Sequence, residues 1–151
     1  MKISSIHDLE KISNKIKKKL TLGDVIFLYG EIGVGKTTFA RFLINNYEKE
    51  KNLKVSEVLS PTFNIVYEYE VGQIKIQHYD LFRLSNYKDI SQLGIFESSN
   101  KHIKIIEWPE LIKPKPLNRI DIMFKYSKLV NSRQIKISGF GKWNRFKFNE
   151  I

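Results

Sequence analysis

Hydrophobic and polar positions repeat with the period of a helix over the first twenty residues. Apolar residues recur at helical spacing and share one face, whereas the lysines of "KIKKK", Lys15 to Lys19, lie on the opposite face. The pattern predicts an amphipathic surface helix that is capped by Ser4 or Ser5. Its apolar face comprises Ile6, Leu9, Ile12, Ile16 and Leu20.

The next segment has the order strand, loop, helix. Gly23-Asp24 predicts a turn into "VIFLYG", a continuous apolar run of strand length that is typical of a buried strand in a parallel sheet. A glycine-rich loop follows, and "KTTFARFLINNYEKE" then shows helical periodicity. The apolar stripe of this second predicted helix comprises Phe39, Phe42, Leu43 and Tyr47.

The remaining chain mixes strand patterns with one short helical pattern. After a polar loop at 49–54, "NIVYEYEVGQIKIQHYD" alternates on both sides of Val71-Gly72, which predicts a β-hairpin. "NYKDISQLGIFESS" predicts a short helix that ends near Gly94, and "IKIIEW", Ile103 to Trp108, predicts a buried strand. "RIDIMFKYSKLVNSRQIKISGFG" predicts a second hairpin. We therefore expect one domain over residues 1–151, an α/β fold with a central, mostly parallel sheet, antiparallel hairpins and flanking helices.

The composition restricts the compartment, the metal sites and the partners that we expect for this protein. The 151 residues include no cysteine, which excludes disulfides and thiolate metal sites and favours a reducing compartment. Neither a signal peptide nor a membrane-spanning run is visible, so we expect a cytoplasmic protein with no membrane partner. The formal charge of +10 suggests a polyanion such as RNA, but lysines scattered over a solvated surface explain it as well. Direct contact with RNA stays open.

One motif indicates a nucleotide. The run from Gly30 to Thr37, "GEIGVGKT", matches the phosphate-binding loop pattern G-x-x-x-x-G-K-[ST]. Its glycines allow successive backbone N–H groups to point at phosphate oxygens, and the following helix presents its N-terminus to the same anion. Lys36 is expected to bridge the β- and γ-phosphates, and the Thr37 hydroxyl to hold Mg²⁺. The predicted nucleotide-binding residues of the loop are Gly30, Gly33, Val34, Gly35, Lys36 and Thr37.

Two acids follow predicted strands and are candidates for hydrolysis chemistry. Asp80 ends "KIQHYD" and Glu107 ends the apolar run "IKII", so both are expected at the carboxyl edge of the sheet, beside the loop. Such acids manage the metal and the attacking water in NTPases. Thr62, in "SPTF", is a candidate switch threonine. His78 is interpreted as a packed residue behind the site, and Trp108 as one that packs over the site or faces a partner.

In order along the chain, "GEIGVGKTT", "SPTF", "HYDLFRL", "LGIFE" and "IIEWPE" closely resemble the TsaE family. The resemblance is strong over about Leu22 to Glu110. It implies a P-loop α/β sheet and slow, Mg²⁺-dependent hydrolysis of ATP. It further implies TsaB and TsaD as partners, which place the threonylcarbamoyl group on the adenosine next to the anticodon of tRNAs that read codons beginning with A. The ATPase would reset that pair between turnovers and would meet tRNA indirectly.

Carried over from the family, Lys36 and Thr37 would serve the phosphates and the metal, and Thr38 would add a phosphate contact. Glu107 matches the acid associated with Mg²⁺, and Asp80 matches the acid that hydrolysis requires. Which of the two acids touches the metal and which orients water stays open.

Three further positions match family residues. Thr62 corresponds to the switch threonine, Trp108 to a tryptophan whose loss impairs function, and Arg133 to a basic residue near the nucleotide, here expected in the turn of the last hairpin. Phe82 departs from a common tyrosine, which removes no catalytic group.

Two other functions compete with an ATPase. A nucleotide-dependent interaction module would bind ATP without essential hydrolysis, but it has no need of both Asp80 and Glu107. A small-molecule kinase usually carries a lid with several arginines. The five arginines here are scattered, which argues against it; they are Arg41, Arg83, Arg119, Arg133 and Arg145.

Overall fold

The structure is a computed structural model that describes residues 1–97, 99–127, 132–146 and 148. Seven strands form one sheet in the order β1-β7-β6-β2-β5-β4-β3. The strands are β1 Lys2–Ile3, β2 Val25–Tyr29, β3 Val66–Val71, β4 Ile74–Asp80, β5 Ile103–Glu107, β6 Arg119–Tyr126 and β7 Arg133–Phe140. The helices are α1 Ile6–Lys17, α2 Lys36–Glu50 and α3 Tyr87–Gln92, with short 3₁₀ turns η1 Ser99–Lys101 and η2 Gly141–Trp143.

The centre of the sheet is parallel and its two sides are antiparallel. Strand β2 pairs in parallel with both β5 and β6, and β4 pairs in parallel with β5. The hairpins β3–β4 and β6–β7 add antiparallel pairs, and β1 closes the edge beside β7. The predicted α/β fold with a mostly parallel centre and antiparallel hairpins is therefore confirmed.

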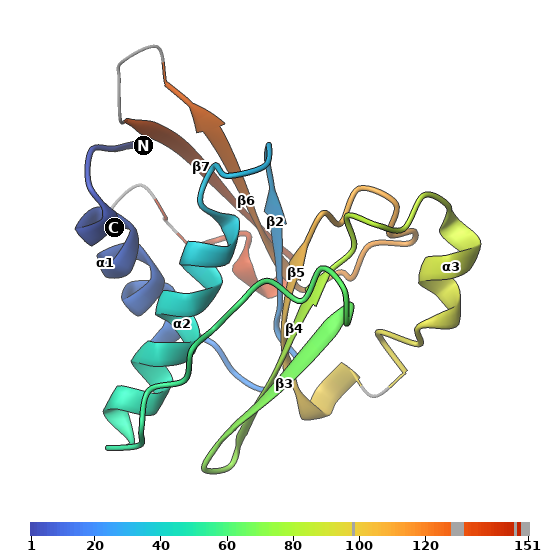
Figure 1. The fold of residues 1–151 in the computed structure, drawn as a ribbon, viewed down its shortest axis with the longest axis horizontal. Coiled ribbons are helices and arrows are strands. Elements are labelled where there is room, and N and C mark those ends of the chain that lie inside the picture. Colours follow the sequence, from blue (N-terminus) through green and yellow to red (C-terminus); the bar gives the residue numbers. More distant parts are fainter. Residues whose placement is uncertain (98, 128–131, 147, 149–151) are drawn as a thin grey trace.

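Helices cover both faces of the sheet, as Figure 1 shows. Alternate residues of β2 point to opposite faces: Ile26 and Leu28 pack in the core under α1 and α2, whereas Val25 and Phe27 pack in a smaller core on the α3 side. Burial on both faces explains why β2 reads as a continuous apolar run instead of an alternating one.

Helix α1 follows the predicted pattern with three corrections. Lys17, expected on the exposed face, is buried and forms an ion pair with Glu50 of α2. Ser5 is the N-cap and forms a capping box with Asp8. Ile6, expected on the buried face, is 66% exposed because it is the first residue of the helix and lies before the turn that meets the core. Leu20 lies beyond the end of the helix at Lys17, although it still packs against the core.

Three other boundaries differ from the sequence patterns. Helix α2 continues to Glu50, into the predicted polar loop. The first hairpin turns at Gly72 and Gln73, one residue later than predicted, where Gly72 adopts a φ of +64°. The two-residue strand β1 was not predicted, because a segment this short has no detectable period and is defined by its pairing with β7. Within the described residues, no helix is long and apolar enough to cross a bilayer.

Candidate functional site

The glycine-rich loop joins the end of β2 to the start of α2 at the carboxyl edge of the parallel strands. Gly30, Gly33 and Gly35 adopt φ angles of +132°, +73° and +120°, which residues with a side chain rarely adopt. At Gly30, a Cβ atom would also lie 2.6 Å from the backbone oxygen of Phe124. The loop therefore requires glycine for its angles and, at its first position, for space.

The side chain of Lys36 points back into the phosphate loop that precedes this residue. Its Nζ donates hydrogen bonds to the backbone oxygens of Gly30, at 2.6 Å, and Glu31, at 2.8 Å. The same ammonium sits 4.0 Å from the centre of the Trp108 ring, a cation–π distance. Burial lowers the pKa of Lys36 below its usual value, and the carboxylate charges, with that of Glu107 the largest, oppose this shift. The ammonium is thus largely removed from water at the place where the motif requires a cation.

Thr37 and Glu107 meet across the site, from the first turn of α2 and the end of β5. The Thr37 hydroxyl lies 2.9 Å and 3.1 Å from the two carboxylate oxygens of Glu107. Behind the acid, Nε2 of the fully buried His78 lies 2.8 Å from Oε1 of Glu107. His78 therefore fixes the carboxylate from within the sheet, consistent with the prediction that it packs behind the site.

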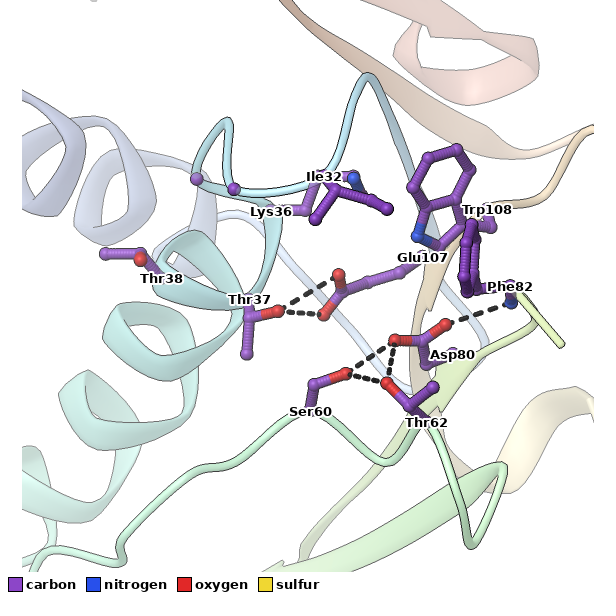
Figure 2. Close-up of a pocket in the computed structure, with 12 residues that line it drawn as sticks. Ile32, Lys36, Thr37, Thr38, Ser60, Thr62, Asp80, Phe82, Glu107 and Trp108 are labelled. Atoms are coloured by element: carbon purple, nitrogen blue, oxygen red, sulfur yellow. Dashed lines mark hydrogen bonds between the residues drawn. The ribbon is translucent and has the colours of Figure 1, made fainter.

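Asp80 is buried next to Glu107 because the register of the parallel strands β4 and β5 places the two acids side by side. The Thr62 hydroxyl donates to Oδ2 of Asp80 at 2.9 Å, and the Ser60 hydroxyl donates to the same oxygen at 2.5 Å. The backbone N–H of Phe82 donates to Oδ1 at 3.0 Å. Figure 2 shows that this cluster and the Thr37–Glu107 pair face the same space.

That space is a cleft of about 360 Å³. Loop glycines, an ammonium, hydroxyls and two carboxylates converge there, the donor set that phosphates and a hard divalent cation require. The arrangement thus fits a nucleotide with Mg²⁺. The lining residues are Ile32, Gly33, Gly35, Lys36, Thr37, Thr38, Ser60, Thr62, Asp80, Phe82, Glu107 and Trp108.

Most of the predicted site residues line this cleft, and three do not. Gly30 lies behind it and accepts from Lys36. Val34 is buried in the core under α1 and α2, so only its backbone belongs to the loop. Arg133 is the first residue of β7, not part of the turn, and does not line the cleft.

Arg133 is connected to the loop through Tyr126. Its guanidinium lies 4.5 Å from the centre of the Tyr126 ring, and the Tyr126 hydroxyl donates to the backbone oxygen of Ile32 at 2.8 Å. Sequence reasoning missed Tyr126, because the patterns place it at the end of a distant hairpin with no chemical motif around it. The hairpin β6–β7 thus holds the tip of the phosphate loop.

Sequence reasoning also missed Ser60 and the packing of Phe82. Ser60 precedes Pro61 in the same "SPTF" string as Thr62, a signal that was available. The ring of Phe82 lies 4.9 Å from that of Trp108, centre to centre. Trp108 adopts a φ of +58° directly after β5, and its backbone N–H donates to the backbone oxygen of Leu28. This bend at the strand end carries the indole over Lys36.

The chain is similar to known proteins of one family. The family model described as threonylcarbamoyl adenosine biosynthesis protein TsaE matches residues 3–135. The chain belongs to the TsaE family. The match covers the loop, both acids, "SPTF" and the first residues of the last strand.

Similar proteins include two from bacteria that are described as tRNA threonylcarbamoyladenosine biosynthesis protein TsaE. One, from Rickettsia felis, is 33% identical over 111 residues; the match covers 74% of this chain and 63% of that protein. The other, from Aquifex aeolicus, is 34% identical over 139 residues; the match covers 89% of this chain and 92% of that protein. The chain thus spans less than two thirds of the Rickettsia relative and nearly all of the Aquifex one.

Among solved structures, the crystal structure of YdiB from Bacillus subtilis matches with a TM-score of 0.74 at 22% identity. The match covers 99% of this chain and 90% of that chain. The described part of this TsaE-family chain therefore shares the YdiB fold.

Proposed function

We propose that this TsaE-family protein is a Mg²⁺-dependent ATPase that acts in the threonylcarbamoyladenosine modification of tRNA. The observation that carries the proposal is the convergence of Lys36, Thr37, Asp80 and Glu107 on one cleft beside a phosphate loop. The phosphate loop alone would account for nucleotide binding. The two buried acids, supplied by adjacent strands, add the groups that hydrolysis needs.

ATP would bind with its phosphates in the loop. The backbone N–H groups of the loop and the N-terminus of the 15-residue helix α2 supply partial positive charge there. Lys36 would exchange its bonds to the Gly30 and Glu31 carbonyls for phosphate oxygens, a short movement of one ammonium. Thr38, on the wall of the cleft, would add a hydroxyl donor. The preference for ATP over GTP is inferred from the family.

Thr37 and Glu107 would hold the metal. Both present oxygen atoms, which Mg²⁺ prefers, and His78 keeps the carboxylate aimed at the threonine. When bound, Mg²⁺ would neutralise charge on the phosphates. Few protein ligands are needed, since Mg²⁺ usually keeps waters and phosphate oxygens in its remaining positions.

Asp80 would orient the attacking water. Oδ2 accepts from Thr62 and Ser60, which holds the carboxylate in one orientation within the cleft. The water oxygen would form a bond to the γ-phosphorus while the bond from that phosphorus to the bridging oxygen breaks, with ADP and phosphate as products. Thr62 lies on the loop before β3, so the position of this loop would change between the ATP-bound and ADP-bound states.

The partners follow from the family. We expect the protein to bind TsaB and TsaD and to support their repeated action on tRNAs that read codons beginning with A, in the cytoplasm where tRNA is modified. The relatives carry this pathway in their descriptions. Hydrolysis would drive the cycling of the partner enzyme, and no substrate other than ATP and water is required.

The test compares Lys36→Ala, Asp80→Ala and Glu107→Ala with the wild type. ATP binding, ATP turnover and multiple-turnover tRNA modification are measured with and without TsaB and TsaD. We expect Lys36→Ala to lose binding and both acid variants to bind ATP but lose turnover and repeated modification. If both acid variants modify tRNA at the wild-type rate, the protein is an interaction module and not an ATPase in function. Turnover that requires an added small-molecule acceptor would identify a kinase.

A further inference from the structure

Among the described residues, no helix covers the outer face of strands β1, β7 and β6. Residues of β6 alternate, so that Ile120, Ile122 and Phe124 point into the core under α1 and α2, and Met123 and Lys125 point outward. In the part of the chain that the structure describes, these three strands add no side chain to the core on the α3 side. One face of this part of the sheet is therefore open to solvent.

This open face carries a groove of about 560 Å³. We call it the lysine groove. Its lining residues are Met1, Lys2, Met123, Lys125, Gln134, Ile135 and Lys136. Strand register explains why they meet: Lys136 is opposite Met123, and Gln134 is opposite both Lys125 and Lys2.

The lysine groove carries three positive charges. Lys2, Lys125 and Lys136 are exposed, and among the described residues none of them forms an ion pair with a carboxylate. Asp121 is the one acid in the three strands, and it pairs with Arg119 at 3.0 Å. An anion that enters the groove would meet three ammonium groups that no described carboxylate pairs with.

The spacing of these lysines suits an extended anion. Lys125 and Lys2 flank Gln134 on neighbouring strands, so their backbones are roughly 10 Å apart. Lys136 is two residues along β7 from Gln134, roughly 7 Å away. Long, exposed lysine side chains act as movable point charges, which neutralise a polymer of phosphates well and grip one small anion poorly. A polymer with a phosphate in each repeating unit therefore fits the groove better than a single phosphate ion.

We propose that the lysine groove binds the phosphodiester backbone of RNA. This inference rests on the proposed function, which makes a tRNA the RNA at hand. The groove offers no aromatic ring for stacking and one amide, Gln134, for hydrogen bonding, so binding depends on salt and hardly on base sequence. The charge of +10 left both RNA binding and a plain solvated surface as explanations, and the groove gathers three of the lysines that contribute to it.

The groove also lies at the nucleotide end of the sheet. Lys125 is followed by Tyr126, whose hydroxyl holds the backbone oxygen of Ile32 in the phosphate loop. Figure 1 shows the β6–β7 hairpin rising beside the loop between β2 and α2. A phosphate bound to Lys125 would therefore lie beside Tyr126, the residue that holds the phosphate loop.

The experiment uses two charge-matched variants of the full chain. The groove variant carries Lys2→Glu, Lys125→Glu and Lys136→Glu; the control carries Lys11→Glu, Lys15→Glu and Lys19→Glu, exposed lysines of α1 and the residues after it. Each variant lowers the formal charge from +10 to +4. Fluorescence anisotropy measures the affinity for an unmodified tRNA transcript over a salt series, and thermal unfolding verifies the fold.

We expect tRNA affinity of the wild type to fall with salt, with a log–log slope of about −2 for three phosphate contacts. The groove variant is expected to lose at least about tenfold in affinity, and the control less than about threefold. Equal losses in both variants, or no binding by the wild type at low salt, would overturn the proposal. So would a groove variant that still binds tRNA but no longer binds TsaB and TsaD, which would indicate an acidic protein partner.

Failure of this inference is separable from failure of the proposed function. ATP turnover without RNA should be unchanged in the groove variant, because none of its three lysines lines the nucleotide cleft. Lys36→Ala should lose turnover and keep tRNA affinity. A protein without ATPase activity could thus still bind tRNA through the lysine groove, and an active ATPase could fail to do so.

Discussion

The hydroxyl of Thr37 lies within 3.1 Å of both carboxylate oxygens of Glu107, although 70 residues separate them along the chain. A helix that begins at the phosphate loop supplies one partner, and the adjacent parallel strand β5 supplies the other. In the proposed function these two side chains would hold the metal, and His78 supports Glu107 from behind.

Glu107→Gln should abolish turnover while keeping the fold. The amide has the same shape but no charge for the metal, so we expect kcat to fall by about 100-fold or more, with ATP binding changed far less. The matched control is Glu110→Gln, an exposed acid three residues later, which should retain wild-type kcat. Steady-state ATPase assays and nucleotide titrations separate the two effects. Equal activity of both variants would exclude Glu107 from the reaction.

Thr62 should act through its hydroxyl. Thr62→Ser keeps a donor for Asp80, whereas Thr62→Val removes it and leaves a similar shape. A lost hydrogen bond to a charged acceptor costs about 1.5–3 kcal/mol, so Thr62→Val should lower kcat by roughly 10- to 100-fold and Thr62→Ser by much less. Turnover at saturating ATP is the measurement. Similar rates for the two variants would show that the hydroxyl has no part in hydrolysis.

Trp108 should report nucleotide binding by its fluorescence. Its ring covers the Lys36 ammonium, and ATP must draw that ammonium toward phosphate. The chain contains two tryptophans, and Trp143 lies in the core away from the cleft. We therefore expect the emission of a Trp143→Phe variant to change saturably with ATP and that of a Trp108→Phe variant to stay constant. A constant signal in the first variant would mean that Lys36 does not move.

Lys36→Met should stabilise the nucleotide-free protein. The folded-state pKa of Lys36 is lowered by burial, so the folded protein binds this proton less tightly than the unfolded chain does. The destabilisation by Lys36 is full below the folded pKa, shrinks as pH rises through it, and is lost above the unfolded value of about 10.4. Thermal unfolding should give a higher Tm for the variant at pH 7, converging with the wild type near pH 10. Added ATP should raise the Tm of the wild type alone.

Tyr126→Phe should weaken nucleotide binding without touching the cleft itself. The variant removes the donor that holds the Ile32 carbonyl, so the tip of the phosphate loop loses a constraint worth about 0.5–1.5 kcal/mol. We expect the Kd for ATP to rise roughly two- to tenfold, with kcat at saturating ATP unchanged. Tyr69→Phe, on β3, is the matched control. An unchanged Kd would show that the loop keeps its shape without the hairpin.

The sequence by itself determined the parts of this protein whose signals are local. The run from Gly30 to Thr37 is read from its own residues, because its glycines and its lysine act within a few positions of each other. The apolar run of β2 and the alternation of β3 and β4 predicted strands for the same reason. Asp80 and Glu107 were found because each follows a strand pattern, and strand ends are where parallel sheets present their functional groups.

Only the tertiary structure decided which of these pieces meet. The register of β4 on β5 sets Asp80 beside Glu107 and aims His78 at the latter, and no local pattern encodes a register between strands 20 or more residues apart. Tyr126 reaches the phosphate loop because β6 pairs with β2 across a long stretch of chain, whereas Arg133 reaches Tyr126 because the two residues are opposite each other in the β6–β7 pair. The lysine groove arises in the same way, from three strands whose lysines share one face once they are paired. Such contacts depend on packing that spans the whole chain, which periodicity and motifs do not report.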